Sequence, residues 1–101
     1  MKLKPQVDFN AINSAALNHL PALLERWLPD GRRQGKEYVA RNPRRADQRT
    51  GSFCVNIYSG RWADFAIGIG GGDVVSLAAY LAGIGQADAA RQLASFLEAT
   101  R

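Results

Sequence analysis

The chain has 101 residues and a formal net charge of +4 at neutral pH, and 47% of its residues are hydrophobic. This length suits one compact domain, and the apolar content can stabilise a core without disulfides or a structural metal. With Cys54 as the single cysteine and His19 as the single histidine, an internal disulfide and a four-ligand Cys/His zinc site are close to excluded. No apolar run reaches the roughly 20 residues of a membrane span, and Met1 to Val7 lack the apolar stretch of a signal peptide. We therefore expect a single domain over residues 1–101 in the reducing cytoplasm, with no membrane partner.

The positive charge is concentrated in the middle of the chain. From Arg26 to Arg61 there are nine lysines and arginines against three acidic residues, so this stretch carries +6 and the two flanks together carry −2. A basic segment in an otherwise near-neutral domain is typical of proteins that bind polyanions. A solvated basic loop that only keeps the protein in solution would give the same pattern, and charge alone does not separate the two.

The first predicted element is a helix from Asp8 to Leu28, capped by Asp8 or Asn10, because apolar residues recur at three- and four-residue intervals. Pro21 removes a backbone donor and crowds the preceding turn. We therefore expect a kink, or two short helices that meet near His19–Pro21. The Pro-Asp-Gly turn at residues 29–31 then ends the helix.

An antiparallel sheet of three short strands is predicted next. The strands cover residues 37–41, 52–58 and 61–65. Alternation in the second strand places Phe53, Val55 and Ile57 on one buried face. Residues 58–61 form a tight hairpin turn in which Gly60 supplies the left-handed conformation. Between the first two strands, residues 42–51 form a polar, arginine-rich loop that is longer than an ordinary hairpin connection.

Two helices complete the chain. A flexible glycine-rich connection at residues 68–72 leads to Asp73, the predicted N-cap of an apolar helix from Val74 to Ala82 that ends at Gly83. A second helix runs from Gln86 to about residue 99. The predicted fold class is α+β: an N-terminal helix kinked at Pro21, a three-stranded antiparallel sheet and two C-terminal helices.

The residues do not favour catalysis or a cofactor. His19 is not placed near a nucleophile, and Asp64 and Asp73 are explained more simply as a turn or salt-bridge residue and a helix cap. The glycine segment lacks the Lys-Ser/Thr of a phosphate-binding loop, and the sheet looks antiparallel rather than parallel as in a dinucleotide-binding fold. We predict a non-catalytic protein with no cofactor and no metal.

Nucleic-acid binding is the remaining candidate. Arginine suits phosphate because its guanidinium donates two parallel hydrogen bonds, and an exposed aromatic ring on a sheet can stack on an unpaired base for about 1–3 kcal/mol. The predicted contact residues are Lys36, Arg41, Arg44, Arg45, Arg49, Tyr58, Arg61 and Trp62. Tyr58 or Trp62 would stack on bases, although Trp62 could equally lie in the core.

Four segments occur in a recognisable order. They are Gly51-Ser52-Phe53-Cys54-Val55, Arg61-Trp62-Ala63-Asp64-Phe65, Gly71-Gly72-Asp73-Val74-Val75-Ser76-Leu77 and residues 86–93. Over residues 37–97 this order resembles the N-terminal zinc-ribbon domain of bacterial and phage DNA primases. In that family one pair of zinc ligands precedes the first of these segments, and a second pair lies in the hairpin that carries the second segment. Here they would fall near Asn42-Pro43 and Ala46, and near Asp64 and Ile67, where there is neither cysteine nor histidine.

The resemblance therefore implies a metal-free version of that module, similar to those at the front of phage, plasmid and integrative-element primase/helicase proteins. It implies an accessory domain that binds single-stranded template DNA during DNA replication of a phage or mobile element. Catalysis does not carry over, because the polymerase part of those proteins supplies the catalytic carboxylates. One alternative is a protein-interaction module that docks on a replication helicase or primase through the apolar helices of residues 74–97. Another is a fragment whose polymerase part lies elsewhere.

Overall fold

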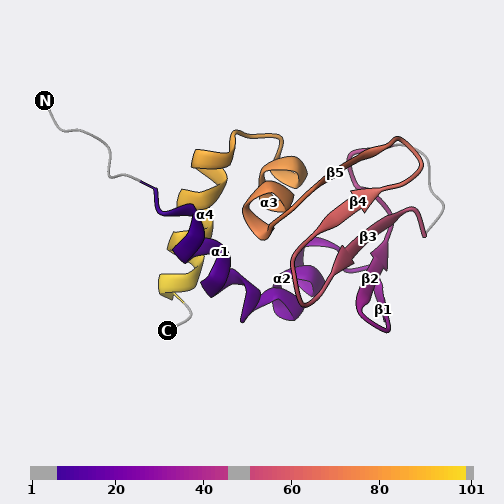
Figure 1. Ribbon diagram of the computed structural model, residues 1–101, viewed down its shortest axis with the longest axis horizontal. Coiled ribbons are helices and arrows are strands. Elements are labelled where there is room, and N and C mark those ends of the chain that lie inside the picture. Colours follow the sequence, from indigo (N-terminus) through magenta and orange to yellow (C-terminus); the bar gives the residue numbers. More distant parts are fainter. Residues whose placement is uncertain (1–6, 46–50, 100–101) are drawn as a thin grey trace, which may run out of the picture.

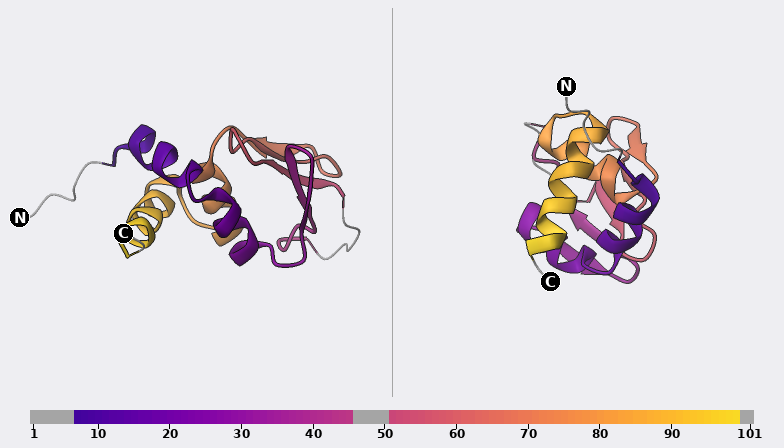
Figure 2. Two further views of the ribbon diagram at one scale, coloured as in Figure 1. Left: turned by 90° about the horizontal axis from the view of Figure 1, so that it is seen from below. Right: turned by 90° about the vertical axis from the view of Figure 1, so that its left-hand side faces the viewer.

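The computed structural model describes residues 7–45 and 51–99, which form an α+β fold. The helices are α1 (Phe9–Leu17), α2 (Leu20–Trp27), α3 (Val74–Ala82) and α4 (Gln86–Ala99). The strands are β1 (Arg32–Gln34), β2 (Glu37–Ala40), β3 (Phe53–Asn56), β4 (Trp62–Asp64) and β5 (Ile69–Gly71). In Figure 1, α1 and α4 lie at one end of the molecule and the sheet at the other, with α2 and α3 between them. The left view of Figure 2 shows the same separation from below.

The predicted three-stranded sheet and three helices are wrong, because the described residues form a five-stranded antiparallel sheet and four helices. Both missed strands are short and lie at the sheet edges, where β1 pairs with β2 and β5 pairs with β4. Their sequences, Arg-Arg-Gln and Ile-Gly-Gly, carry no apolar alternation. Backbone hydrogen bonds therefore hold them, and Ile69 of β5 is their one apolar side chain that packs against the core. The glycine segment predicted as a flexible connection therefore contains a strand.

The N-terminal segment forms two helices rather than one kinked helix. The helix α1 is capped by Asp8, whose side chain accepts a hydrogen bond from the Ala11 N–H at 3.0 Å. It ends before Asn18, and α2 begins at Leu20 with Pro21 in its first turn, where a proline costs no hydrogen bond. This is the second of the two outcomes predicted from Pro21.

The strands follow one another in the order β1-β2-β3-β4-β5, and their register defines two faces. Directly opposite residues share a face, as Tyr38 does with Val55 and Val55 with Trp62. This core face also holds Ala40, Phe53 and Asp64, and all six of these residues are buried. The opposite face, called the open face here, carries Arg32, Gln34, Glu37, Val39, Cys54, Asn56, Ala63 and Gly70. The predicted burial of Phe53, Val55 and Ile57 is confirmed.

Aromatic rings join the sheet to α3 on the core face. The ring of Trp62 lies 5.8 Å from that of Phe53 and 4.9 Å from that of Tyr80, measured between centroids. The Trp62 Nε1–H donates to Ser76 Oγ at 2.9 Å, so its polar atom is satisfied inside the core. A Cβ on Gly71 would collide with both partners of this hydrogen bond, which explains the glycine there.

The two C-terminal helices have the predicted bounds. Asp73 forms a capping box with Ser76 at the start of α3, and Gly83 ends that helix in the left-handed conformation, with φ 68°. The helix α4 packs against α3 and α1, and the three helices lie side by side in Figures 1 and 2. None of the described helices is both long and apolar enough to cross a membrane.

Candidate nucleic-acid interface

The structure divides the predicted contact residues between the two ends of the sheet. Lys36, Tyr58 and Arg61 lie at the turn end, where the β1–β2 and β3–β4 turns meet. Arg41, Arg44 and Arg45 lie at the loop end, where the chain leaves β2 and the β4–β5 turn closes. Arg49 is outside the described residues. Trp62 is in the core between the two ends.

At the loop end a buried carboxylate organises the chain. Asp64 is fully buried, and its Oδ2 accepts hydrogen bonds from Asn42 Nδ2 and Arg45 Nε, each at 2.9 Å. Its Oδ1 accepts from the Ala66 N–H at 3.0 Å. Asn42 is also buried and donates to the Tyr80 hydroxyl of α3 at 2.7 Å. This Asp64 cluster (Asn42, Arg45, Asp64 and Tyr80) ties the segment after β2 to β4 and to α3, and it confirms the predicted salt-bridge role of Asp64.

The surroundings of Asp64 fix its charge. Burial alone raises its pKa, but hydrogen bonds from Asn42 and the Ala66 N–H, together with the charge and hydrogen bond of Arg45, outweigh burial. The pKa of Asp64 is therefore held below its usual value, and the carboxylate is ionised at neutral pH.

The arginines of the loop end are in large part structural. The Arg45 side chain is 17% exposed, because it pairs with Asp64 and its Nη2 donates to Ser52 Oγ at 3.2 Å. The Arg44 Nη1 donates to the Tyr80 carbonyl at 2.9 Å, and its guanidinium lies over the Tyr80 ring at 5.2 Å. Arg44 remains exposed nonetheless, as does Arg41. The loop end thus presents two of its three described arginines to solvent.

The turn end has no buried acidic group among the described residues. The predicted hairpin turn is confirmed, with Gly60 at φ 78° and the backbone N–H groups of Tyr58 and Ser59 both donating to Asn56 Oδ1. Tyr58 is 63% exposed, and its hydroxyl accepts a hydrogen bond from Arg33 Nη2 at 3.0 Å. Lys36 and Arg61 are exposed beside it. Arg33 was missed as a candidate because β1 was not predicted.

The exposed aromatic ring of β4 is not the predicted one. Trp62 is 7% exposed and packed between Phe53 and Tyr80, so it offers no face for stacking. Phe65, which follows the same strand, is 74% exposed. Its N–H donates to the Ser52 carbonyl at 2.9 Å, which continues the β3–β4 ladder by one residue. Strict alternation from a buried Trp62 would have placed Phe65 on the open face.

A shallow groove of about 760 Å³ runs over the open face of β3, β4 and β5. Its lining residues are Glu37, Cys54, Asn56, Arg61, Trp62, Ala63, Phe65, Gly70, Gly71 and Gly72. The small residues Cys54, Ala63 and Gly70 lie directly opposite one another on neighbouring strands and form its floor. Because Arg61 precedes β4 and Phe65 follows it, the groove has a cation at the turn end and an exposed ring at the loop end.

The described residues do not fit a zinc ion or an activated thiol. They contain no group of three or more His, Cys, Asp or Glu side chains that could hold a metal. At the positions where the resemblance to primase zinc ribbons would place the ligands, Asp64 is engaged by Arg45, and Asn42, Pro43 and Ile67 offer no thiolate or imidazole. Ala46 is outside the described residues. Burial, with the nearby charges of Glu37 and Asp64, raises the pKa of Cys54, which is the opposite of an activated nucleophile.

Comparison with models of protein families, with curated proteins and with solved structures finds no match for this chain.

Proposed function

We propose that this chain is a non-catalytic accessory domain that binds single-stranded nucleic acid, template DNA in the first place, across the open face of its sheet. The observation that carries the proposal is the groove over β3–β5, with Arg61 at one end and the exposed Phe65 ring at the other. The replication setting, in a phage or mobile element, rests on the resemblance of residues 37–97 to primase zinc-ribbon domains. A cytoplasmic location belongs to the same proposal.

A single strand suits this surface better than a duplex. The bases of a duplex are stacked on one another, whereas those of a single strand are free to stack on an aromatic side chain. Phe65 presents its ring at the edge of a groove whose floor is formed by the small residues Cys54, Ala63 and Gly70. The bases would therefore lie on the groove floor and against Phe65, with the phosphates towards the cations.

The charges around the groove favour a polyanion. Glu37 is the one acidic residue among the described lining residues, whereas Arg61 lies in the groove and Lys36 and Arg33 are exposed at the same end of the sheet. Arg41 and Arg44 supply exposed cations at the loop end. Phosphate contacts at both ends would hold a strand along β4, with Tyr58 as a second exposed ring at the turn end.

The test is a fluorescence-anisotropy titration of a labelled single-stranded oligonucleotide at low salt, repeated at increasing salt. We expect binding that weakens steeply with salt, because counterions are released from the phosphates. Phe65→Ala should weaken binding about fivefold to more than a hundredfold, the equivalent of about 1–3 kcal/mol for one stacked base. The double variant with Phe65→Ala and Arg61→Ala should bind the oligonucleotide more weakly than Phe65→Ala alone.

Arg91→Ala is the matched control, because Arg91 lies on α4, pairs with Asp88 and does not line the groove. It should leave the affinity for the oligonucleotide close to that of the parent chain. The proposal fails if the parent chain shows no binding at low salt, or if Phe65→Ala and Arg91→Ala bind equally well. If the parent chain binds, an amide-shift titration with the same oligonucleotide locates the interface, and we expect the largest shift changes in β3–β5.

A further inference from the structure

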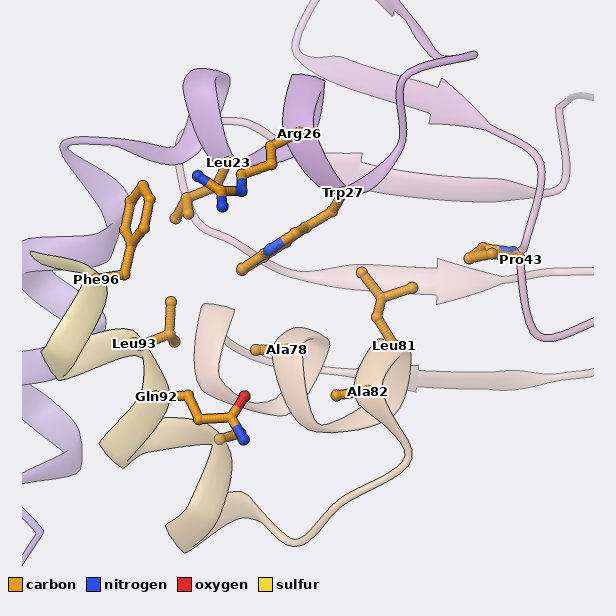
Figure 3. Close-up of a pocket in the computed structure, with 11 residues that line it drawn as sticks. Leu23, Arg26, Trp27, Pro43, Ala78, Leu81, Ala82, Gln92, Leu93 and Phe96 are labelled. Atoms are coloured by element: carbon orange, nitrogen blue, oxygen red, sulfur yellow. The ribbon is translucent and has the colours of Figure 1, made fainter.

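A second groove lies among the helices, away from the open face. Its volume is about 440 Å³, within the range of pockets that accept ligands or anchoring side chains. Its lining residues are Leu23, Arg26, Trp27, Pro43, Ala78, Leu81, Ala82, Ala89, Gln92, Leu93 and Phe96. In Figure 3 the Trp27 ring extends from α2 into the space bordered by α3 and by Leu93 and Phe96 of α4. We call it the helix groove.

The helix groove is formed by helix faces that border the main core and are only partly covered by it. In α2 the lining residues are spaced i, i+3 and i+4, and α3 repeats this spacing with Ala78, Leu81 and Ala82. Leu23 and Leu93 are buried at its base, but Trp27, Leu81 and Phe96 are only partly buried. Each of these helices therefore has more apolar surface than its own fold covers, which is typical of a surface that binds another chain.

The charge of the helix groove specifies its occupant. Arg26 is the one charged lining residue among those described, and its guanidinium lies 5.4 Å from the centre of the Phe96 ring. Among the described residues, no carboxylate makes an ion pair with Arg26. An apolar groove with one unpaired guanidinium at its edge is complementary to an apolar surface that carries a carboxylate.

We infer that the helix groove binds an amphipathic helix of a partner protein, with its apolar stripe against α3 and α4 and an Asp or Glu against Arg26. Small side chains at Ala78, Ala82 and Ala89 allow the backbone of such a helix to approach closely, and Trp27 and Phe96 provide large anchoring contacts. This site shares no lining residue with the groove on the open face.

Segments of the same chain outside the described residues have the wrong chemistry for this groove. Residues 1–6 contain two lysines, which would repel Arg26. Residues 46–50 and 100–101 contain a single apolar residue, Ala46. The occupant that we infer is a partner protein whose contacting helix is acidic and apolar.

The first test selects binders from a display library of short helical peptides, using the full chain as bait. We expect the enriched peptides to share apolar residues at i, i+3 or i+4, and i+7, with an acidic residue at one fixed position beside that stripe. Ala82→Arg places a long cation in the groove at an exposed position and should abolish binding of these peptides. Ala11→Arg adds the same side chain on α1, outside the groove, and should not.

The second test exchanges the charges. Arg26→Glu should weaken binding of an enriched acidic peptide by tenfold or more, as expected for one charge-assisted hydrogen bond, and a lysine in place of the peptide's acidic residue should restore it. Enriched peptides without an acidic residue, insensitivity to Ala82→Arg, or failure of the charge exchange would each overturn the inference. Because Ala82→Arg and Ala11→Arg should bind the single-stranded oligonucleotide equally, this result is independent of the proposed nucleic-acid site.

Discussion

The two ends of the sheet carry similar basic residues and use them differently. At the loop end Arg45 is bound to the buried Asp64, and Arg44 is laid over Tyr80. At the turn end Lys36 and Arg61 are exposed, and the contacts described for Arg33 are with Tyr58 and the Gly35 carbonyl, not with an acidic group. The number of cations at a site is thus a poor guide to its function, because a buried carboxylate turns an arginine from a ligand contact into part of the fold.

The largest expected effect comes from the loop end. Asp64→Ala removes the buried carboxylate that accepts from Asn42, Arg45 and the Ala66 N–H, and breaking such a buried ion pair costs about 3–5 kcal/mol of unfolding free energy. Urea denaturation at neutral pH measures this loss. Asp73→Ala, which removes a helix cap instead, should cost only about 1 kcal/mol. Equal losses for the two variants would contradict the central role given to Asp64.

The next largest effect is the difference in unfolding free energy between an arginine substitution at the loop end and one at the turn end. Arg45→Ala removes charge-assisted hydrogen bonds from a side chain that is 17% exposed, and we expect it to lower the unfolding free energy by about 1.5–3 kcal/mol. Arg61→Ala removes an exposed side chain and should change the unfolding free energy by no more than about 0.5 kcal/mol. Both variants are compared by urea denaturation, and the distinction between the ends disappears if their losses are the same.

Acid should weaken the loop end selectively. Because the pKa of folded Asp64 lies below the unfolded value of about 3.9, the ionised carboxylate contributes stability at every pH above that value. This contribution is lost as the pH falls through the folded-state pKa, in a window below about pH 4. We expect this loss of stability to be smaller than that from Asp64→Ala or Arg45→Ala, because a protonated carboxyl still accepts hydrogen bonds. Asp64→Asn should lack this part of the pH dependence when unfolding is followed from pH 7 to pH 3.

The smallest effect is expected from a single exposed cation at the turn end. Lys36→Ala should leave stability unchanged and should reduce the slope of log affinity against log salt for the oligonucleotide by about 1, the value for one lost phosphate contact. Anisotropy titrations at several salt concentrations give the slope. An unchanged slope would remove Lys36 from the interface without affecting the role of Phe65.

The sequence predicted the elements that have strong local signals. The helices α3 and α4 have the expected bounds because Asp73 and Gly83 mark the ends of α3 and apolar spacing marks both. The strands β1 and β5 have no such signal, because edge strands of arginine, glutamine and glycine depend on pairing with a neighbour that is only placed in the folded chain. The errors in the fold are therefore the two edge strands and the number of helices, since the predicted N-terminal helix is two helices, α1 and α2.

The sequence predicted most of the residues at the candidate site, but not which of them are buried or paired and which are exposed. Arg45 and Asp64 are 19 residues apart in the sequence, and nothing local to either one indicates their pairing. Trp62 and Phe65 have similar chemistry, and their opposite burial follows from the register of β4 on β3, which alternation could have given once one of the two was placed inside. The apolar helices of residues 74–97 were predicted as a possible docking surface, but the part that α2 plays in the helix groove has no local sequence signal.

The Asp64 cluster also determines what this domain requires from its surroundings. A ribbon that is closed by zinc must be loaded with metal, and it is lost to chelators and to oxidants of its thiolates. Here hydrogen bonds of Asn42, Arg45 and Tyr80 join the segment after β2 to strand β4 and helix α3. All of these groups are side chains of the protein itself. The Asp64 cluster therefore forms as the chain folds. Its contribution to stability should depend on pH and not on metal supply or redox state.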